Sequence, residues 1–161
     1  AVERMAEIMS MCDRNNPVYD QVTSFSVALY ALGFCDCPDF ISFQDVSAGE
    51  AAELLCTHFS EVDPDEIPED YHLIRSKERY LLVIGDPLFP IHFAVIADKR
   101  AERPYFSKLP FFGAGYDSLD ELVTEFVGID GVTREDFHFF RKNRPGRIPS
   151  SSLGKIYIVR D

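Results

Sequence analysis

The sequence predicts a segregated α+β fold, in which an antiparallel sheet of about four to five strands is covered by three N-terminal and two C-terminal helices. The central observation is residues 80–98, where two short apolar runs rich in β-branched and aromatic residues flank a Gly-Asp-Pro turn. That pattern is typical of a β-hairpin. The second observation is the order of the elements. Helical patterns lie before and after the strands instead of alternating with them, which argues against a wound parallel sheet.

Length and composition are those of a single folded domain spanning residues 1–161. The chain is 46% hydrophobic and 27% charged, so disorder of the whole chain is not expected. A formal net charge of −11 opposes binding to nucleic acid or to an anionic membrane, because both are polyanions. No apolar run is long enough to span a bilayer and no export signal is visible, so we expect a cytoplasmic protein with reduced cysteines.

Two helices are expected at the start of the chain. Apolar residues recur at helical spacing over 2–12, and the Asn-Asn-Pro run at 15–17 ends that pattern. A second helix is expected from Tyr19 to Gly33. It is apolar on most of its faces, which is typical of a buried helix, and its terminal glycine suits a helix end.

The next stretch combines a loop, a third helix and a second loop. Residues 34–43 are rich in Cys, Asp and Phe and are expected to form a loop with at most a short strand. Ser47 followed by Glu50 forms a capping box, which begins the third helix. Residues 61–70 are mostly acidic and include two prolines, so charge repulsion and missing backbone donors predict an exposed loop.

The strands are expected to follow as a meander over 71–98. Residues 71–76 are predicted to form its first strand and 77–78 its turn, with the hairpin supplying the other two strands. A short edge strand is predicted over 104–108, because an edge tolerates proline. Residues 110–115 are rich in Phe and Gly and are expected to form a loop.

Two further helices are expected after the meander. Ser118 begins a capping box, the apolar residues behind it follow the helical template without a miss, and Gly128 ends the helix. Thr133 begins another apparent box, so the sequence predicts a second, short helix that contains Phe137 and Phe140.

The end of the chain is basic and then rich in Pro and Ser. Residues 141–152 are therefore expected to form a loop, and the alternating residues 155–159 a final strand that returns to the sheet. Of the basic residues near this loop, Arg141 and Lys142 are expected to stabilise a helix C-terminus. The alternatives are that the cluster docks on the acidic 61–70 loop or binds the acidic surface of a partner. The cluster consists of Arg134, Arg141, Lys142, Arg144 and Arg147. The net charge argues against nucleic acid as their partner.

His92 is the main candidate for chemistry, because it lies in an apolar strand beside a turn that contains Asp86. A hydrolase would use Cys12, Ser24 or Ser26 as the nucleophile on an N-terminal helix, the histidine as the base and Asp86 as the acid that orients the ring. This order is similar in outline to that of papain-type proteases, but no Cys-Gly-Ser-Cys stretch supports it. A histidine that is part of the core is the favoured interpretation.

A zinc site is a second alternative, since two clusters of cysteine and histidine could supply four ligands. These are Cys35, Cys37, Cys56 and His58. Their spacing opposes the hypothesis, because structural zinc sites use two to four intervening residues. Two helical residues that are two positions apart also project in different directions. We therefore predict no metal and no cofactor.

The favoured hypothesis is a small protein-interaction or regulatory module that acts through shape and charge, with a protein as its partner. No complete catalytic site can be identified in the sequence. The acidic loop and the Phe-rich loop are the expected contact surfaces. Their residues are Glu61, Asp63, Asp65, Glu66, Phe111 and Phe112.

Overall fold

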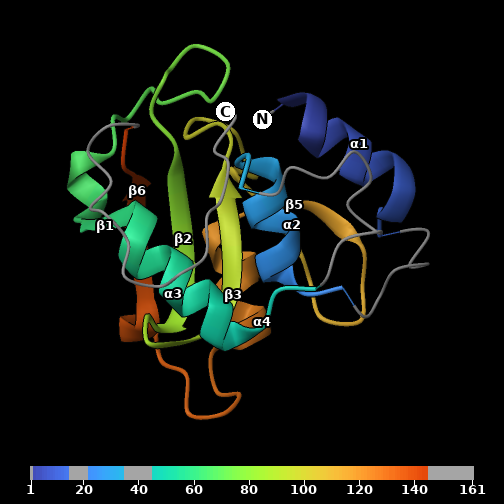
Figure 1. The fold of residues 1–161 in the computed structure, drawn as a ribbon, viewed down its shortest axis with the longest axis vertical. Helices are drawn as coiled ribbons and strands as arrows, with labels where there is room; N and C mark the ends of the chain where they lie inside the picture. Colours follow the sequence, from blue (N-terminus) through green and yellow to red (C-terminus); the bar gives the residue numbers. More distant parts are fainter. Residues whose placement is uncertain (1, 15–21, 35–44, 145–161) are drawn as a thin grey trace.

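The computed structural model describes residues 2–14, 22–34 and 45–144, which form the α+β architecture that the sequence predicts (Figure 1). The helices in this part of the chain are α1 (Val2–Cys12), α2 (Ser24–Ala31), α3 (Ala48–His58) and α4 (Leu119–Phe126). Its strands are β1 (Phe59–Val62), β2 (Tyr80–Asp86), β3 (Phe89–Ile96), β4 (Tyr105–Lys108), β5 (Ala114–Asp117) and β6 (Phe137–Lys142). They form one antiparallel sheet in the order β1-β6-β2-β3-β4-β5.

Helices cover both faces of the sheet (Figure 1). On one face, α2 and α3 pack against alternate residues of the central strands, such as Leu81 and Phe93, and α1 packs against α2 and β5. On the other face, Leu122 and Phe126 of α4 pack against the intervening residues, such as Leu82. Because successive strand residues point to opposite faces, a central strand between two helical layers is apolar along its whole length.

The predicted hairpin is confirmed, and it contains a β-bulge. Strands β2 and β3 pair antiparallel with Ile84 opposite His92 and Gly85 opposite Pro90, so Ile91 is an extra residue without a partner in β2. Gly85 has a φ of +101°, and a Cβ there would lie 3.1 Å from the Ile91 backbone nitrogen. A bulge bends its strand and redirects neighbouring side chains, and this one lies beside the candidate site described below.

The N-terminal helices largely follow the prediction. Helix α1 has the expected bounds, and α3 has the predicted capping box between Ser47 and Glu50. Helix α2 begins at Ser24 rather than at Tyr19, because the side chain of Thr23 accepts from the Ser26 amide and caps the helix there. Residues 35–44 lie outside the described part of the chain.

The predicted first strand of the meander is wrong. Residues 71–76 form turns that touch the sheet through the Leu73 amide, which donates to the Ala97 carbonyl at 2.8 Å, and through a single bridge between His72 and Asp98. The place beside β2 is taken by β6, which comes from the end of the chain. Strand β6, which is distant in sequence, therefore pairs with the edge of β2 where residues 71–76 were predicted to lie.

Strand β6 also replaces the predicted second C-terminal helix. The capping box at Thr133 is present, but it begins only a 3-10 turn, Arg134–Asp136, before the chain becomes extended. Phe139 and Phe140 then contribute to the two opposite cores, which two consecutive residues of a strand can do. Pairing with both β1 and β2 satisfies the backbone groups on both edges of this strand.

Other segments differ from the prediction in smaller ways. The predicted strand at 104–108 exists as β4, but β5 covers it, so β4 is not an edge strand and part of 110–115 is extended. The acidic segment begins inside β1 and continues as a 3-10 turn, Pro64–Glu66. Helix α4 has the predicted cap at Ser118 and ends before Gly128, whose φ is +94°. The final strand predicted at 155–159 lies outside the described residues.

Candidate functional site

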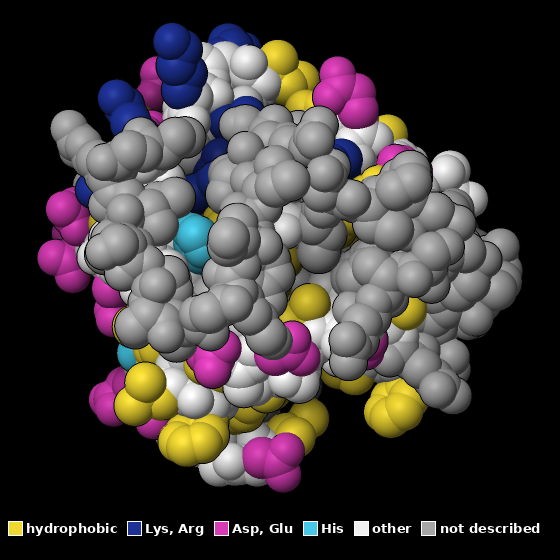
Figure 2. Space-filling model, in the orientation of Figure 1, with side chains coloured by type: hydrophobic (Ala, Val, Ile, Leu, Met, Phe, Trp, Pro, Cys, Tyr) yellow, Lys and Arg dark blue, Asp and Glu magenta, His cyan; other side chains and the backbone are white. Residues whose placement is uncertain are grey.

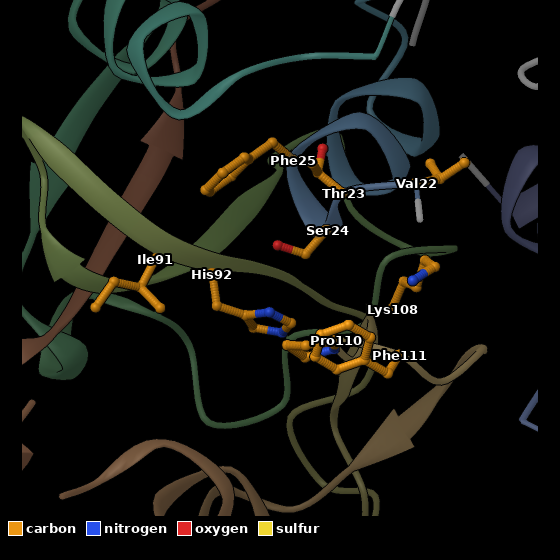
Figure 3. Close-up of a pocket in the computed structure, with 9 residues that line it drawn as sticks. All are labelled: Val22, Thr23, Ser24, Phe25, Ile91, His92, Lys108, Pro110 and Phe111. Atoms are coloured by element: carbon orange, nitrogen blue, oxygen red, sulfur yellow. The ribbon is translucent and has the colours of Figure 1, made fainter. Parts of the chain in front are cut away.

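A pocket of about 360 Å³ opens where the start of α2 meets β3 and the end of β4 (Figure 3). It is lined by residues 22–25, by Ile91 and His92 of β3, and by Lys108, Pro110 and Phe111. Three segments that are far apart in sequence therefore build one concave site. Its volume is in the range of pockets that hold small molecules or single side chains of a partner.

The pocket exists because strands β3 and β4 separate there. Their pairing is Val95 with Phe106 and Ile96 with Tyr105, and continuing it would place Phe93 opposite Lys108. The Phe93 amide instead donates to the hydroxyl of Ser24 at 3.1 Å. A side chain of α2 thus replaces the backbone of β4 as the partner of β3. The sheet opens without leaving that amide unsatisfied.

The bulge places the His92 ring beneath this opening. The side chain is 0% exposed, and its ring lies 4.4 Å from the Phe126 ring of α4, measured between centroids. In Figure 3 the ring extends from β3 toward Pro110 and Phe111. Neither ring nitrogen has a hydrogen-bond partner among the described residues. An unsatisfied buried polar group is costly, and it marks a position where a ligand or water could bond.

The electrostatic environment keeps the imidazole neutral. Burial is the main cause that lowers the pKa of His92 to about 3, and the positive charges of Arg14 and Lys108 add to this effect. Arg14 forms a bidentate ion pair with the carboxylate of Asp117. Lys108 is 2% exposed, and its Nζ donates to the Leu109 carbonyl at 3.4 Å. The ring therefore carries one N–H donor and one acceptor at neutral pH.

The rim of the pocket is aromatic and exposed. Phe111 is 80% exposed and has a φ of +64°, a left-handed conformation that is strained for a bulky residue. The adjacent Phe112 is 51% exposed, and Ile91 borders the pocket on the β3 side. Local strain that holds an exposed aromatic ring at a pocket is a feature that clusters at binding sites.

The comparisons with known proteins do not identify a family for this chain. Comparison with family models, with curated proteins and with solved structures finds no match in any of the three. Within the described ranges, no helix combines the length and apolarity needed to cross a membrane. The function must therefore be argued from the residues of the pocket.

The structure brings together only part of the proposed catalytic set. Ser24 and His92 line one pocket, but they approach it from opposite faces of β3, one from α2 and the other against α4. No hydrogen bond joins them, because both ring nitrogens are without a partner in this part of the chain. Asp86 is exposed at the hairpin turn, where Oδ1 accepts from the Leu88 amide at 2.9 Å.

Neither of the other two candidate nucleophiles is among the described residues that line the pocket. Cys12 is the last residue of α1, and the described side chains do not include it. Ser26 is buried on α2, where its hydroxyl donates to the Asp45 carboxylate and accepts from the Val46 amide at 2.8 Å. Its role is to attach the segment before α3 to the start of α2.

The acidic residues predicted as a contact surface lie at the other end of the sheet. Glu61 is in the edge strand β1, where its carboxylate lies 3.2 Å from Nδ1 of His138. The amide of Asp63 donates to the Glu66 carboxylate at 2.6 Å, which stabilises the 3-10 turn that also contains Asp65. These side chains are exposed, but they do not form one surface with Phe111 across the described sheet.

The zinc hypothesis gains nothing from the described residues. Cys56 is exposed, whereas His58 of the same helix is buried against the Phe34 ring at a centroid distance of 5.1 Å. No group of three or more His, Cys, Asp or Glu that could hold a metal occurs within residues 2–14, 22–34 and 45–144. Cys35 and Cys37 lie outside these ranges.

The predicted basic cluster is dispersed by strand β6. Lys142 is buried and its Nζ donates to the Leu32 carbonyl at 2.8 Å, so it supports the end of α2 and does not stabilise a helix of its own. Arg144 pairs with Glu78, and Arg134 lies in the 3-10 turn. On the face shown in Figure 2, the visible Lys and Arg side chains lie in the upper part, whereas acidic side chains occur along the upper, left and lower edges. Arg147 lies outside the described residues.

Sequence reasoning missed two features of the pocket. Lys108 carried no signal, because a lysine at a strand end is ordinarily a surface residue. The bulge at Ile91 could have been suspected from Gly85, since a glycine inside a strand pattern often marks a bulge. Phe111 was predicted as a contact residue from the composition of its loop alone.

Proposed function

We propose that the chain is a protein-interaction module and that the pocket around His92, with Phe111 on its rim, is its contact site. The observation that carries this proposal is the exposed Phe111 ring, held in a strained backbone beside a pocket whose buried histidine has no partner in the described chain. The exposed and free thiol of Cys56 fits a reducing compartment, so we also propose a cytoplasmic location. Identifying the partner would show whether the module has a regulatory role.

Interaction explains the site better than a purely structural role does. A large aromatic ring that is mostly in water contributes little to folding, and its left-handed backbone costs roughly 1–3 kcal/mol. Aromatic residues, Phe among them, are enriched in the buried cores of protein interfaces. The exposure of the Phe111 ring and the strain of its backbone are therefore both explained if the ring becomes buried against a partner.

The substitution Phe111→Asn is expected to abolish partner binding while leaving the fold intact or slightly more stable. Asn tolerates the left-handed conformation better than Phe, so the free energy of unfolding should stay equal or rise by about 1 kcal/mol. Binding should be compared by capturing proteins on immobilised wild-type and variant chains, and stability by urea denaturation.

The matched control is Ile129→Asn, which removes another exposed apolar side chain, 54% exposed, that does not line the pocket. Its set of captured partners should equal that of the wild type. An identical set of partners on the Phe111→Asn chain would contradict the proposal. The same conclusion would follow if both substitutions removed the same partners, because binding would then be independent of the pocket.

A hydrolase remains a second candidate, because Ser24 and His92 line the same pocket. The separation of their side chains by β3 and the low pKa of the histidine make a serine–histidine pair a poor general-base system at neutral pH. We therefore expect no labelling of Ser24 by a fluorophosphonate, measured by mass spectrometry, and no difference between wild type and Ser24→Ala. Selective labelling of Ser24 would make the hydrolase the better proposal.

A further inference from the structure

We infer that the pocket receives an uncharged aromatic hydroxyl group, the phenol of a tyrosine side chain that belongs to the partner. This inference rests on the proposed function and names the group that enters the site. Its basis is one buried ring, His92, whose two nitrogens have no hydrogen-bond partner among the described residues. Free phenols carry the same hydroxyl group on the same ring, so small phenols serve as probes of the site.

The His92 ring sets the hydrogen-bonding requirement. Burial is the main cause that holds the pKa of the imidazole at about 3, so at neutral pH one ring nitrogen donates and the other accepts. A hydroxyl group matches either nitrogen, since it has one proton to donate and two lone pairs. A primary amide has two N–H donors and a carbonyl, and most of these would stay unsatisfied against a single ring. The ring therefore favours a hydroxyl group over an amide.

The charges near the ring favour an uncharged ligand. The Arg14 guanidinium is paired with the Asp117 carboxylate. Lys108 donates from Nζ to the Leu109 carbonyl and makes a further interaction within the chain. An anion would therefore be buried without a cation of its own, which is costly. A cation would meet the positive charges of Arg14 and Lys108, which already help to lower the pKa of His92.

The walls of the pocket fit the ring of a tyrosine. A volume of about 360 Å³ is enough for one aromatic side chain. Serine and threonine carry a hydroxyl group but no ring to bury, and the indole of tryptophan only donates, so it matches just one of the two imidazole nitrogens. Tyrosine combines an apolar body with a hydroxyl group at its tip. The apolar residues of the lining are Val22, Phe25, Ile91, Pro110 and Phe111.

The ligand reaches His92 past the segment that carries Pro110 and Phe111. The ring extends toward these two residues and is 0% exposed, so a ligand must displace part of this segment (Figure 3). Phe111 yields at low cost, because its side chain is 80% exposed and its φ of +64° is strained. The Ser24 hydroxyl lies on the other face of β3, where it accepts from the Phe93 amide, and it is not counted as a ligand contact.

The test compares p-cresol with p-xylene, in which a methyl group replaces the hydroxyl group, on the wild-type chain at pH 7. The cresol is uncharged there, because a phenol has a pKa of about 10. We expect p-cresol to shift the ¹⁵N resonance of one His92 ring nitrogen in a saturable way, since that nucleus reports a new hydrogen bond directly. The xylene should leave this resonance near its value in the free protein. No saturable shift from p-cresol, or an equal shift from both compounds, would overturn the inference.

A carboxylate at the same position of the ring tests the requirement for an uncharged group. We expect 4-methylbenzoate to bind at least about tenfold more weakly than p-cresol, because its charge would be buried without a free cation. Binding of 4-methylbenzoate that equals or exceeds that of p-cresol would contradict the assignment of an uncharged ligand.

A variant pair locates the effect at the ring. The ratio of p-cresol affinity to p-xylene affinity isolates the contribution of the hydroxyl group. This ratio should fall about tenfold in His92→Phe, which cannot form the hydrogen bond. His138→Phe makes the same substitution on β6, at a described residue outside the pocket, and should leave the ratio unchanged. An unchanged ratio in His92→Phe, or an equal fall in both variants, would contradict the inference, and the wild-type resonances decide the matter if His92→Phe does not fold.

Two short peptides identify the source of the hydroxyl group. They are identical except for a central tyrosine in one and a phenylalanine in the other. The tyrosine peptide should bind more tightly than the phenylalanine peptide and than p-cresol, because its backbone adds contacts with Phe111 at the rim. A tyrosine peptide that binds no tighter than p-cresol would assign the site to small phenols and overturn the assignment to a partner. Absence of any p-cresol effect on His92 together with Phe111-dependent partner capture would reject this inference and leave the proposed function standing.

Discussion

Replacing His92 with Phe is expected to remove a large part of the acid sensitivity of the fold. The folded ring has a pKa of about 3, whereas a histidine in the unfolded chain has a pKa of about 6.5. Between these values the unfolded state binds more protons, so the free energy of unfolding falls as the pH falls. The contribution is fully present above pH 6.5 and decreases by about 1.4 kcal/mol per pH unit toward pH 3.

Urea denaturation of both proteins at pH 7 and pH 4.5 measures this effect. The wild type should lose about 3 kcal/mol more than His92→Phe between these two pH values, because the carboxylates common to both chains cancel in the comparison. At pH 7 the variant should be as stable or more stable, since an apolar ring removes two unsatisfied nitrogens. An equal loss in both proteins would show that the ring is accessible to solvent protons in the folded state.

Replacing Phe93 with Ala is expected to cost about 3–5 kcal/mol, a large share of the stability of a domain of this size. The Phe93 side chain is completely buried and packs edge to face on the Phe25 ring at a centroid distance of 4.9 Å. It connects β3 to α2, so its removal leaves a cavity directly beside the pocket.

Phe89→Ala is the matched control for this prediction, because it makes the same substitution in the same strand at a position that is 76% exposed. Its cost should stay within about 0.5 kcal/mol. Thermal or urea unfolding of both variants gives the comparison. Similar losses for the two positions would contradict the assignment of which β3 residues face the α2 layer.

Local signals in the sequence were sufficient to predict the elements whose structure is decided locally. The hairpin follows from two apolar runs around a turn, and the helices at Ser47 and Ser118 follow from their capping boxes. The predicted box at Thr133 is present, but the predicted helix after it is wrong, because the box begins only a 3-10 turn. The residues that follow it pair with β1 and β2, and the paired residues are at least 53 positions apart along the chain (Ile84 with Phe137). A local sequence pattern cannot predict pairing between residues so far apart along the chain.

The candidate site shows the same limit. His92 could be singled out because a histidine in an apolar strand is unusual, and Phe111 because its loop is rich in Phe. The two residues lie at the same pocket because β3 separates from β4 there. The Ser24 hydroxyl makes this separation possible, since it accepts the hydrogen bond from the Phe93 amide that β4 does not accept. The acid expected to orient the ring, Asp86, instead stabilises the hairpin turn. Spacing in the sequence carried no information about either fact.

The central claim is that His92 is a neutral, buried ring in a binding pocket and not a poised catalytic base. The direct measurement is a pH titration of its ring ¹⁵N resonances in the folded protein. We expect the ring to stay neutral from pH 8 down to about pH 4, with a midpoint at about 3. A midpoint near 6.5, or a ring that is protonated at neutral pH, would contradict it.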